Sequence, residues 1–213
     1  MIINRKHFIK STVEALIQNG AKPTRILNLG AGFSPLALEL STLLGDRTRF
    51  IEMDMKNMSH KQQVYSELVP DLGRFISCIK ADIADTACLE ETLHREMGEP
   101  AQTRLIVIME GLSYYIGRPA MERVLESLST LAPDLSIIFE HLKPCRLISE
   151  ERRFIPHGIF SHVIRAILGP GFSLRYCDMD AMESGRTGSC RYFPTPDAGW
   201  LSCAVTERRP DTE

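Results

Sequence analysis

The sequence predicts an α/β fold in which a mainly parallel, doubly wound sheet carries helices on both faces. Short apolar runs alternate with longer segments that have apolar residues at helical spacing, a pattern typical of parallel sheets. The most hydrophobic run lies within residues 103–109, as expected for a strand buried on both sides. Residues 25–40 pass from an apolar run through Gly-x-Gly into leucines at helical spacing, which indicates a strand, a tight turn and a helix.

The elements follow one another in a regular order. We expect helices at 8–17, 36–44, 57–68, 87–97 and 119–131, and strands at 25–29, 49–54, 74–80, 103–109 and 135–141. Residues 150–168 are expected to be mostly helical. Two closing β runs, 173–178 and 199–207, are expected to be joined by a loop over 184–198, which adds an antiparallel strand at the C-terminal end.

Length and composition favour one soluble domain. The 213 residues suit a single unit made of an N-terminal helix (1–22), a core (23–142) and a closing segment (143–213). A net charge of -2 argues against a basic nucleic-acid-binding surface. The cysteines form no C-x-x-C pair, so we expect no metal site. Because we find neither a signal peptide nor a membrane-length apolar run, we expect a cytoplasmic protein.

The turn at Gly30 and Gly32 is the first candidate for ligand contact. Glycine allows positive φ angles and a close backbone approach. Ser34 and Pro35 suit the N-cap and the first position of the next helix. The dinucleotide pattern G-x-G-x-x-G needs a third glycine where this chain has Pro35, so a pyrophosphate is not expected here.

Acidic residues follow the next predicted strands. Asp54 closes 49–54, where a carboxylate can bind a ribose diol, and Glu52 is held in reserve. Asp82, preferred over Asp85, follows 74–80 and suits an adenine amino group. Glu110 emerges from the most hydrophobic strand, where a carboxylate is costly unless it is paired. Ligands of parallel sheets bind at the carboxyl ends of the strands, so these residues are expected to share one site.

Several of these motifs together resemble a known family. The chain resembles the S-adenosylmethionine-dependent leucine carboxyl methyltransferase family in four runs. These are 27–33 (LNLGAGF), 52–54 (EMD) with Lys61 after it, 81–83 (ADI) and above all 110–116 (EGLSYYI). The resemblance covers roughly residues 4–142. It implies a Rossmann-like class I methyltransferase fold, S-adenosylmethionine as cofactor and S-adenosylhomocysteine as its product.

The resemblance also assigns a part of the cofactor to each candidate residue. It implies that Asp54 binds the ribose and that Asp82 and Ile83 contact the adenine. At the methionine portion, it implies contacts with Gly30 and Gly32, and it assigns the amino group to Glu110. The carboxylate is assigned to Arg5, with Lys6 as the alternative. A guanidinium matches a carboxylate better than an ammonium does, which favours Arg5 over Lys6.

The chain departs from the family pattern at two places. Ser34-Pro35-Leu36 stands where the family usually has Asp-Thr-Arg, so an acid and an arginine expected near the cofactor are missing. The N-terminal region that covers the substrate in larger relatives is short. An open pocket, or one completed by a second subunit of a homodimer or by a bulky substrate, is therefore expected.

Candidate residues for the substrate side follow the later strands. Tyr115 and His141 are the preferred catalytic candidates, one as a pocket residue and the other as a possible base. Further candidates that stay open are Tyr114, Arg152, Arg153 and His157.

The expected function is transfer of a methyl group to a carboxylate or hydroxyl oxygen of a small-molecule or carrier-bound substrate, without nucleic-acid or membrane partners. Methyl transfer from a sulfonium mainly requires alignment of the acceptor and exclusion of water. The alternatives are a protein carboxyl methyltransferase and a non-catalytic binding module of the same fold. A Rossmann oxidoreductase is disfavoured by the missing third glycine.

Overall fold

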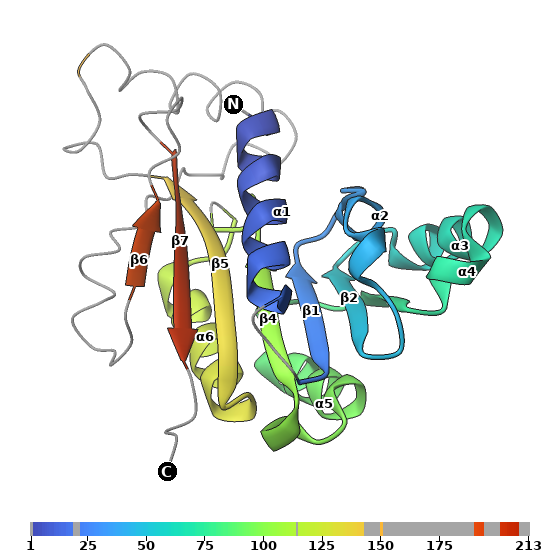
Figure 1. Ribbon diagram of the computed structural model, residues 1–213. Coiled ribbons are helices and arrows are strands. Elements are labelled where there is room, and N and C mark those ends of the chain that lie inside the picture. The colour runs from blue at the N-terminus through green and yellow to red at the C-terminus, as the bar shows by residue number, and fades with distance from the viewer. Residues whose placement is uncertain are drawn as a thin grey trace.

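The fold is built on one seven-stranded sheet with the order β3-β2-β1-β4-β5-β7-β6 (Figure 1). The computed structural model describes residues 2–18, 22–113, 115–142, 150, 190–193 and 201–208. Strands β1 to β5 pair in parallel, whereas β7 pairs antiparallel with both β5 and β6. The strands are β1 (Thr24–Leu29), β2 (Thr48–Asp54), β3 (Ile76–Lys80), β4 (Arg104–Met109), β5 (Asp134–Leu142), β6 (Cys190–Phe193) and β7 (Leu201–Arg208).

Helices lie on both faces of this sheet. The α-helices are α1 (Ile2–Gln18), α2 (Leu36–Glu39), α3 (Met58–Leu68), α4 (Pro70–Gly73), α5 (Thr86–Met97) and α6 (Arg118–Leu131), with 3₁₀ turns at Ser41–Leu43 and Pro100–Gln102. Buried side chains of α1, α2 and α3 pack on one face, and those of α5 and α6 pack on the other. The result is an α/β/α arrangement of three layers.

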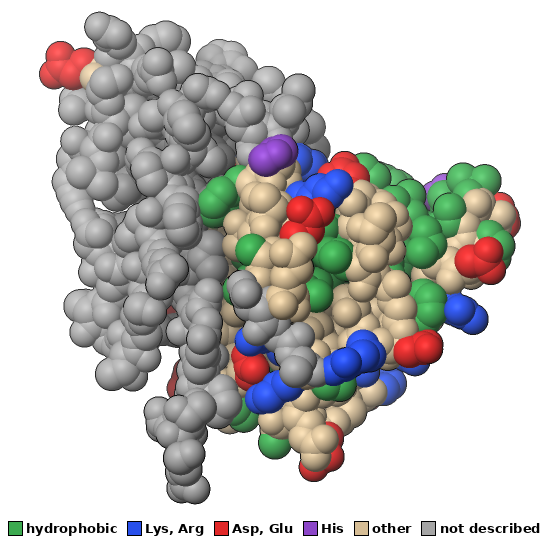
Figure 2. All heavy atoms as spheres, in the orientation of Figure 1, with side chains coloured by type: hydrophobic (Ala, Val, Ile, Leu, Met, Phe, Trp, Pro, Cys, Tyr) green, Lys and Arg blue, Asp and Glu red, His purple; other side chains and the backbone are tan. Residues whose placement is uncertain are grey.

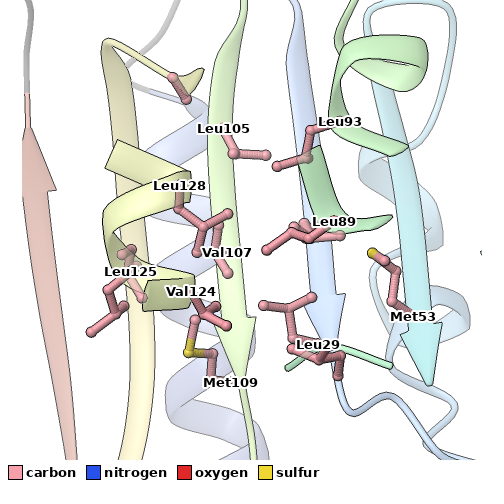
Figure 3. Close-up of a cluster of buried hydrophobic side chains, with 14 of the residues drawn as sticks. Leu29, Met53, Leu89, Leu93, Leu105, Val107, Met109, Val124, Leu125 and Leu128 are labelled. Atoms are coloured by element: carbon pink, nitrogen blue, oxygen red, sulfur yellow. The ribbon is translucent and has the colours of Figure 1, made fainter. Parts of the chain in front are cut away.

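Alternation along the central strands explains the two core clusters. In β4, Ile106 and Ile108 face α1 and α2, whereas Val107 and Met109 face α5 and α6. Figure 3 shows the second cluster, in which leucines of α5 and α6 pack over β1 and β4. A strand buried on both faces needs apolar residues at successive positions, as the sequence of β4 has.

The topology marks one end of the sheet as the place for a ligand. The chain moves outward from β1 to β3 and then returns to β4, which lies on the other side of β1. Such a reversal opens a crevice at the carboxyl ends of the two central strands. Gly30 follows β1 and Glu110 follows β4, so both lie at this crevice.

Three details differ from the sequence-based expectations. The first helix begins at Ile2 rather than at residue 8, so Arg5 and Lys6 lie within α1 and not before it, because no helix-breaking residue precedes Phe8. The helix expected over 36–44 is divided into α2 and a 3₁₀ turn. Strand β6 lies inside the segment expected as the loop 184–198.

Parts of the expected C-terminal region cannot be compared. The helix expected at 150–168, apart from Glu150, and the β run expected at 173–178 lie outside the described residues. Within the part of the chain that the structure describes, no helix has both the length and the apolar character needed to span a bilayer.

Candidate active site

The turn after β1 has the backbone that its glycines allow. Gly30 and Gly32 both have positive φ angles, 73° and 47°. A Cβ atom on Gly30 would lie 2.9 Å from Cδ1 of Leu112, so the turn packs directly against the segment that follows β4. A Cβ on Gly32 would meet nothing within 4 Å. The backbone at Gly32 therefore faces open space, as a ligand-binding turn requires.

Asp54 is connected to this turn by hydrogen bonds. The backbone N–H of Gly32 donates to Oδ2 of Asp54 over 3.0 Å, and the N–H of Lys56 donates to Oδ1 over 3.1 Å. A carboxylate offers about four lone-pair positions, so these bonds leave room for further donors. Asp54 is partly exposed and can accept bonds from a diol at the end of β2.

The segment after β3 holds the next pair of candidates. The Asp82 side chain is exposed, and its Oδ1 accepts a hydrogen bond of 2.9 Å from the backbone N–H of Ala84. Ile83 is only 4% exposed and belongs to the core cluster under α5 and α6. Asp85 caps α5 by accepting from the N–H of Cys88, which gives it a structural role instead.

A network of charged side chains links α1 to the ends of β4 and β5. Arg5 contacts Oε1 of Glu110 through NH2 and Oε1 of Glu140 through NH1, both at 2.8 Å. Lys6 reaches Oε2 of Glu110 at 3.0 Å and the hydroxyl of Ser34 at 2.6 Å. The Glu110 carboxylate is therefore paired by cations, as its position after the most hydrophobic strand required. Basic and acidic side chains also lie next to each other on the surface shown in Figure 2.

Ser34 serves this network and not the helix that follows. Pro35, rather than Ser34, is the N-cap residue of α2, and no side chain caps this helix. The expectation that Ser34 caps α2 is therefore wrong, because its hydroxyl accepts a hydrogen bond from Lys6 instead.

Glu140 is a site residue that the sequence analysis did not select. Its side chain is buried, and its Oε2 accepts a hydrogen bond of 2.8 Å from the N–H of Gly111, whose φ is +68°. Glu140 therefore holds both Arg5 and the turn after β4. Its position in β5 could have identified it, because side chains alternate between the two faces of a strand. Glu140 therefore shares the face of Ile138, which packs against α1 and α2, whereas Phe139 points to the other face.

A second buried network lies beneath the glycine turn. Lys61 of α3 contacts Oε2 of Glu52 at 2.8 Å and donates to the carbonyl oxygens of Gly32 and Ser34. Glu52 is fully buried, and its Oε2 also accepts from the Tyr65 hydroxyl. Burial raises the pKa of Glu52, and the bonds from Lys61 and Tyr65 oppose that shift. Glu52, the reserve candidate for the ribose, is thus closed off from the crevice.

The substrate-side candidates are only partly described. The Tyr115 side chain is 47% exposed, and burial of the remainder raises its pKa, so the phenol stays protonated near neutral pH. Tyr115 lies just beyond the turn that Gly111 begins, with its N–H donating to the carbonyl of Leu112. His141 lies in β5, but its side chain, like Tyr114, Arg152, Arg153 and His157, falls outside the described residues.

The described groups include the types of charge and hydrogen-bond acceptor that S-adenosylmethionine would require. A zwitterionic amino acid end requires cations and a carboxylate, which Arg5, Lys6 and Glu110 supply. A ribose diol requires acceptors such as Asp54, and an adenine amino group requires one such as Asp82. Phe33 and Met55, which follow the glycine turn and Asp54, expose apolar side chains beside these polar groups.

Comparisons with solved structures identify the fold. The chain matches a putative methyltransferase from Thermobifida fusca with a TM-score of 0.71 and 12% identity, over 97% of this chain and 81% of that chain. It matches the CurJ carbon methyltransferase with a TM-score of 0.63 and 13% identity, over 96% of this chain. Only 54% of the CurJ chain is covered, so our chain spans about half of that protein.

A third solved structure also matches most of the chain. The N-terminal domain of EvdMO1, solved in the presence of S-adenosylhomocysteine and D-fucose, matches with a TM-score of 0.57 and 16% identity, over 94% of this chain and 82% of that domain. These neighbours place the fold among Rossmann-like methyltransferases. No curated protein matches the sequence significantly.

The sequence itself matches a family model. The leucine carboxyl methyltransferase model matches residues 1–129, which include every described side chain of the site except Glu140. This match covers more than half of the 213 residues. The chain therefore belongs to the leucine carboxyl methyltransferase family, whose members are S-adenosylmethionine-dependent methyltransferases.

Proposed function

We propose that this protein transfers the methyl group of S-adenosylmethionine to a carboxylate or hydroxyl oxygen of a small-molecule or carrier-bound substrate. The observation that carries the proposal is the charged network of Arg5, Lys6 and Glu110 beside the open turn at Gly32. This arrangement offers both signs of charge to an amino acid end at the point where the sheet topology opens a crevice.

The residues of the chain would act mainly by orientation. When bound, S-adenosylmethionine supplies an electrophilic methyl group on a sulfonium sulfur. Asp54 and Asp82 would fix the nucleoside, while Arg5, Lys6 and Glu110 would fix the amino acid end. Tyr115, with its protonated phenol, is suited to donate a hydrogen bond to an acceptor oxygen rather than to remove a proton. His141 is the proposed base for a hydroxyl acceptor.

An oxygen acceptor is supported by the family and by simple chemistry. The family is described by methylation of a leucine carboxyl group, and a carboxylate is already ionised at neutral pH. Such an acceptor needs alignment but no base. A protein carboxyl group remains a second candidate for the same reason, because the family description itself names a carboxyl group of an amino acid.

The first test is calorimetric titration with S-adenosylmethionine and with S-adenosylhomocysteine. Micromolar binding of both is expected, and a folded sample that binds neither would refute the cofactor assignment. The purified protein is then incubated with acceptor mixtures and isotopically labelled S-adenosylmethionine. A carboxyl methyl ester releases labelled methanol in mild base, whereas a methyl ether does not, so this step distinguishes the two oxygen acceptors.

Cofactor binding without transfer to any carboxylate, hydroxyl or peptide carboxyl acceptor would favour the non-catalytic alternative. In that case the proposed function would be wrong, although the fold and the family would stand.

A further inference from the structure

Lys61 makes a set of contacts that the reaction itself does not require. Its ammonium has three N–H donors, and each has an acceptor: Oε2 of Glu52 at 2.8 Å, the carbonyl of Ser34 at 2.8 Å and the carbonyl of Gly32 at 3.0 Å. The Lys61 side chain is only 6% exposed. A buried lysine with all donors used is fixed in position, and it fixes the groups that it contacts.

The acceptors of Lys61 belong to the turn that faces the cofactor crevice. Gly32 is held at both of its backbone groups, because its carbonyl accepts from Lys61 and its N–H donates to Asp54. The side of Gly32 where a Cβ would lie is open. Gly32 therefore connects the position of the Asp54 carboxylate with that of the turn, and Lys61 anchors Gly32 through its carbonyl.

Stability alone does not explain the pair of Glu52 and Lys61. Removing two charges from water carries a large desolvation penalty, and apolar replacements of buried ion pairs are often neutral or stabilising. Within the described residues, Oε1 of Glu52 has no hydrogen-bond partner, so the pair is not even fully satisfied. The bonds from Lys61 to the carbonyls of Gly32 and Ser34 give the pair a second use, which is to fix the geometry of the turn.

We infer that Lys61 is a positioning residue of the cofactor site, which acts by anchoring the turn from Gly32 to Ser34 and, through Gly32, the carboxylate of Asp54. Glu52 keeps the Lys61 ammonium charged and aimed at the turn. The inference rests on the proposed binding of S-adenosylmethionine at this turn, and it adds a residue pair that does not touch the cofactor.

The decisive variant replaces both charges at once. Lys61→Met alone removes the donors to the turn but leaves Glu52 as a buried unpaired charge, so its effects on folding and on binding are mixed. Combining Glu52→Gln with Lys61→Met removes the donors and leaves no buried charge. Glu52→Gln alone keeps the two bonds from Lys61 to the turn. Comparing these variants separates the anchoring of the turn from the loss of an ion pair.

We expect the double variant to unfold in urea close to the wild-type midpoint but to bind S-adenosylhomocysteine at least tenfold more weakly by calorimetry. Glu52→Gln keeps the bonds from Lys61 to the turn but leaves the buried ammonium without its counter-charge, so its affinity should lie between that of wild type and that of the double variant. Hydrogen exchange of the backbone amides in 30–36 should be faster in the ligand-free double variant than in wild type, because the turn has lost its anchor.

Arg104→Met is the matched control. Arg104 also forms an ion pair of low exposure, with Asp134 at 3.1 Å, and donates to a backbone carbonyl, that of Leu16. Arg104 and Asp134 are the first residues of β4 and β5. The pair therefore lies at the amino ends of the strands, whereas the site lies at their carboxyl ends. This variant should lose stability without changing exchange in 30–36, which is the readout that separates it from the double variant. Its cofactor affinity is not used as the control, because Arg104 also holds Leu16 of α1, the helix that carries Arg5 and Lys6.

Wild-type affinity in a folded double variant would overturn the inference. Should the double variant not fold, Glu52→Gln with Lys61→Gln provides a more polar neutral pair, and the same readouts apply. If wild type itself does not bind S-adenosylhomocysteine, the proposed function fails, and the exchange experiment alone decides the inference. Unchanged exchange in 30–36 then refutes the anchoring role.

Discussion

Replacing Glu110 by glutamine should weaken cofactor binding in a way that depends on the amino acid end of the ligand. The change keeps the shape of the side chain but removes its charge. In the structure the Glu110 side chain is 9% exposed, at 2.8 Å from Arg5 and 3.0 Å from Lys6. A glutamine retains one acceptor for these cations and no longer attracts the ammonium of a bound methionine moiety.

The expected size follows from this partial burial. Two unit charges about 4 Å apart near a protein surface interact with about 4 kcal/mol at an effective dielectric constant of about 20. Water, Arg5 and Lys6 reduce the net value for the ligand, so we expect a loss of at least about 1.4 kcal/mol, which is tenfold in affinity.

Two ligands and a control variant make the assay specific. S-adenosylhomocysteine carries the amino acid end, whereas 5′-methylthioadenosine lacks it but keeps adenine and ribose. Calorimetry should show that Glu110→Gln loses affinity for the first ligand only. Glu90→Gln, which removes a carboxylate that accepts from Ser127 on the opposite face of the sheet, should change neither. Equal losses for both ligands, or none for S-adenosylhomocysteine, would refute the assignment of Glu110.

Other variants test the remaining parts of the site and core. Asp54→Ala should weaken S-adenosylhomocysteine and 5′-methylthioadenosine alike, at least tenfold by calorimetry, because both contain ribose. Gly30→Ala should lower the urea midpoint more than Gly32→Ala. Both add backbone strain of about 1–2 kcal/mol, but only the first also contacts Leu112. Burial, together with a nearby carboxylate, raises the pKa of Cys78 to about 12 from 9.0. Its alkylation at pH 8, followed by peptide mass spectrometry, should be slow until urea unfolds the protein. Its contribution to stability should be complete below about pH 9 and fall as the pH rises toward 12.

Much of the architecture follows from local patterns in the sequence. The run in β4 has apolar residues at successive positions, so its burial between two layers of helices could be predicted without any knowledge of its neighbours. Asp54, Asp82 and Glu110 lie at the carboxyl ends of β2, β3 and β4, and their grouping follows from the parallel arrangement, which brings those ends together. These predictions needed only the period of the pattern and the order of the elements.

The partners of these residues could not be predicted in the same way. The contacts of Arg5 with Glu110 and Glu140 join residues far apart in the sequence, and no periodicity encodes such pairings. Lys61 lies in a helix that reads as polar and solvated. A spacing signal was nevertheless present, because Met58, Lys61 and Tyr65 follow one another at intervals that place them on one buried face.

The origin of Arg5 and Lys6 in α1 has a consequence for the dynamics of the protein. A helix on the outer face of a sheet normally opens locally more often than the central strands do. In the proposed site this helix supplies the cations for one end of the cofactor, so a ligand that engages them would bind only the form in which the helix is packed in place. Cofactor binding should therefore slow hydrogen exchange across Ile2–Gln18, even at amides far from the ligand. In the proposed site, cofactor binding and the packing of α1 against the sheet are therefore thermodynamically coupled.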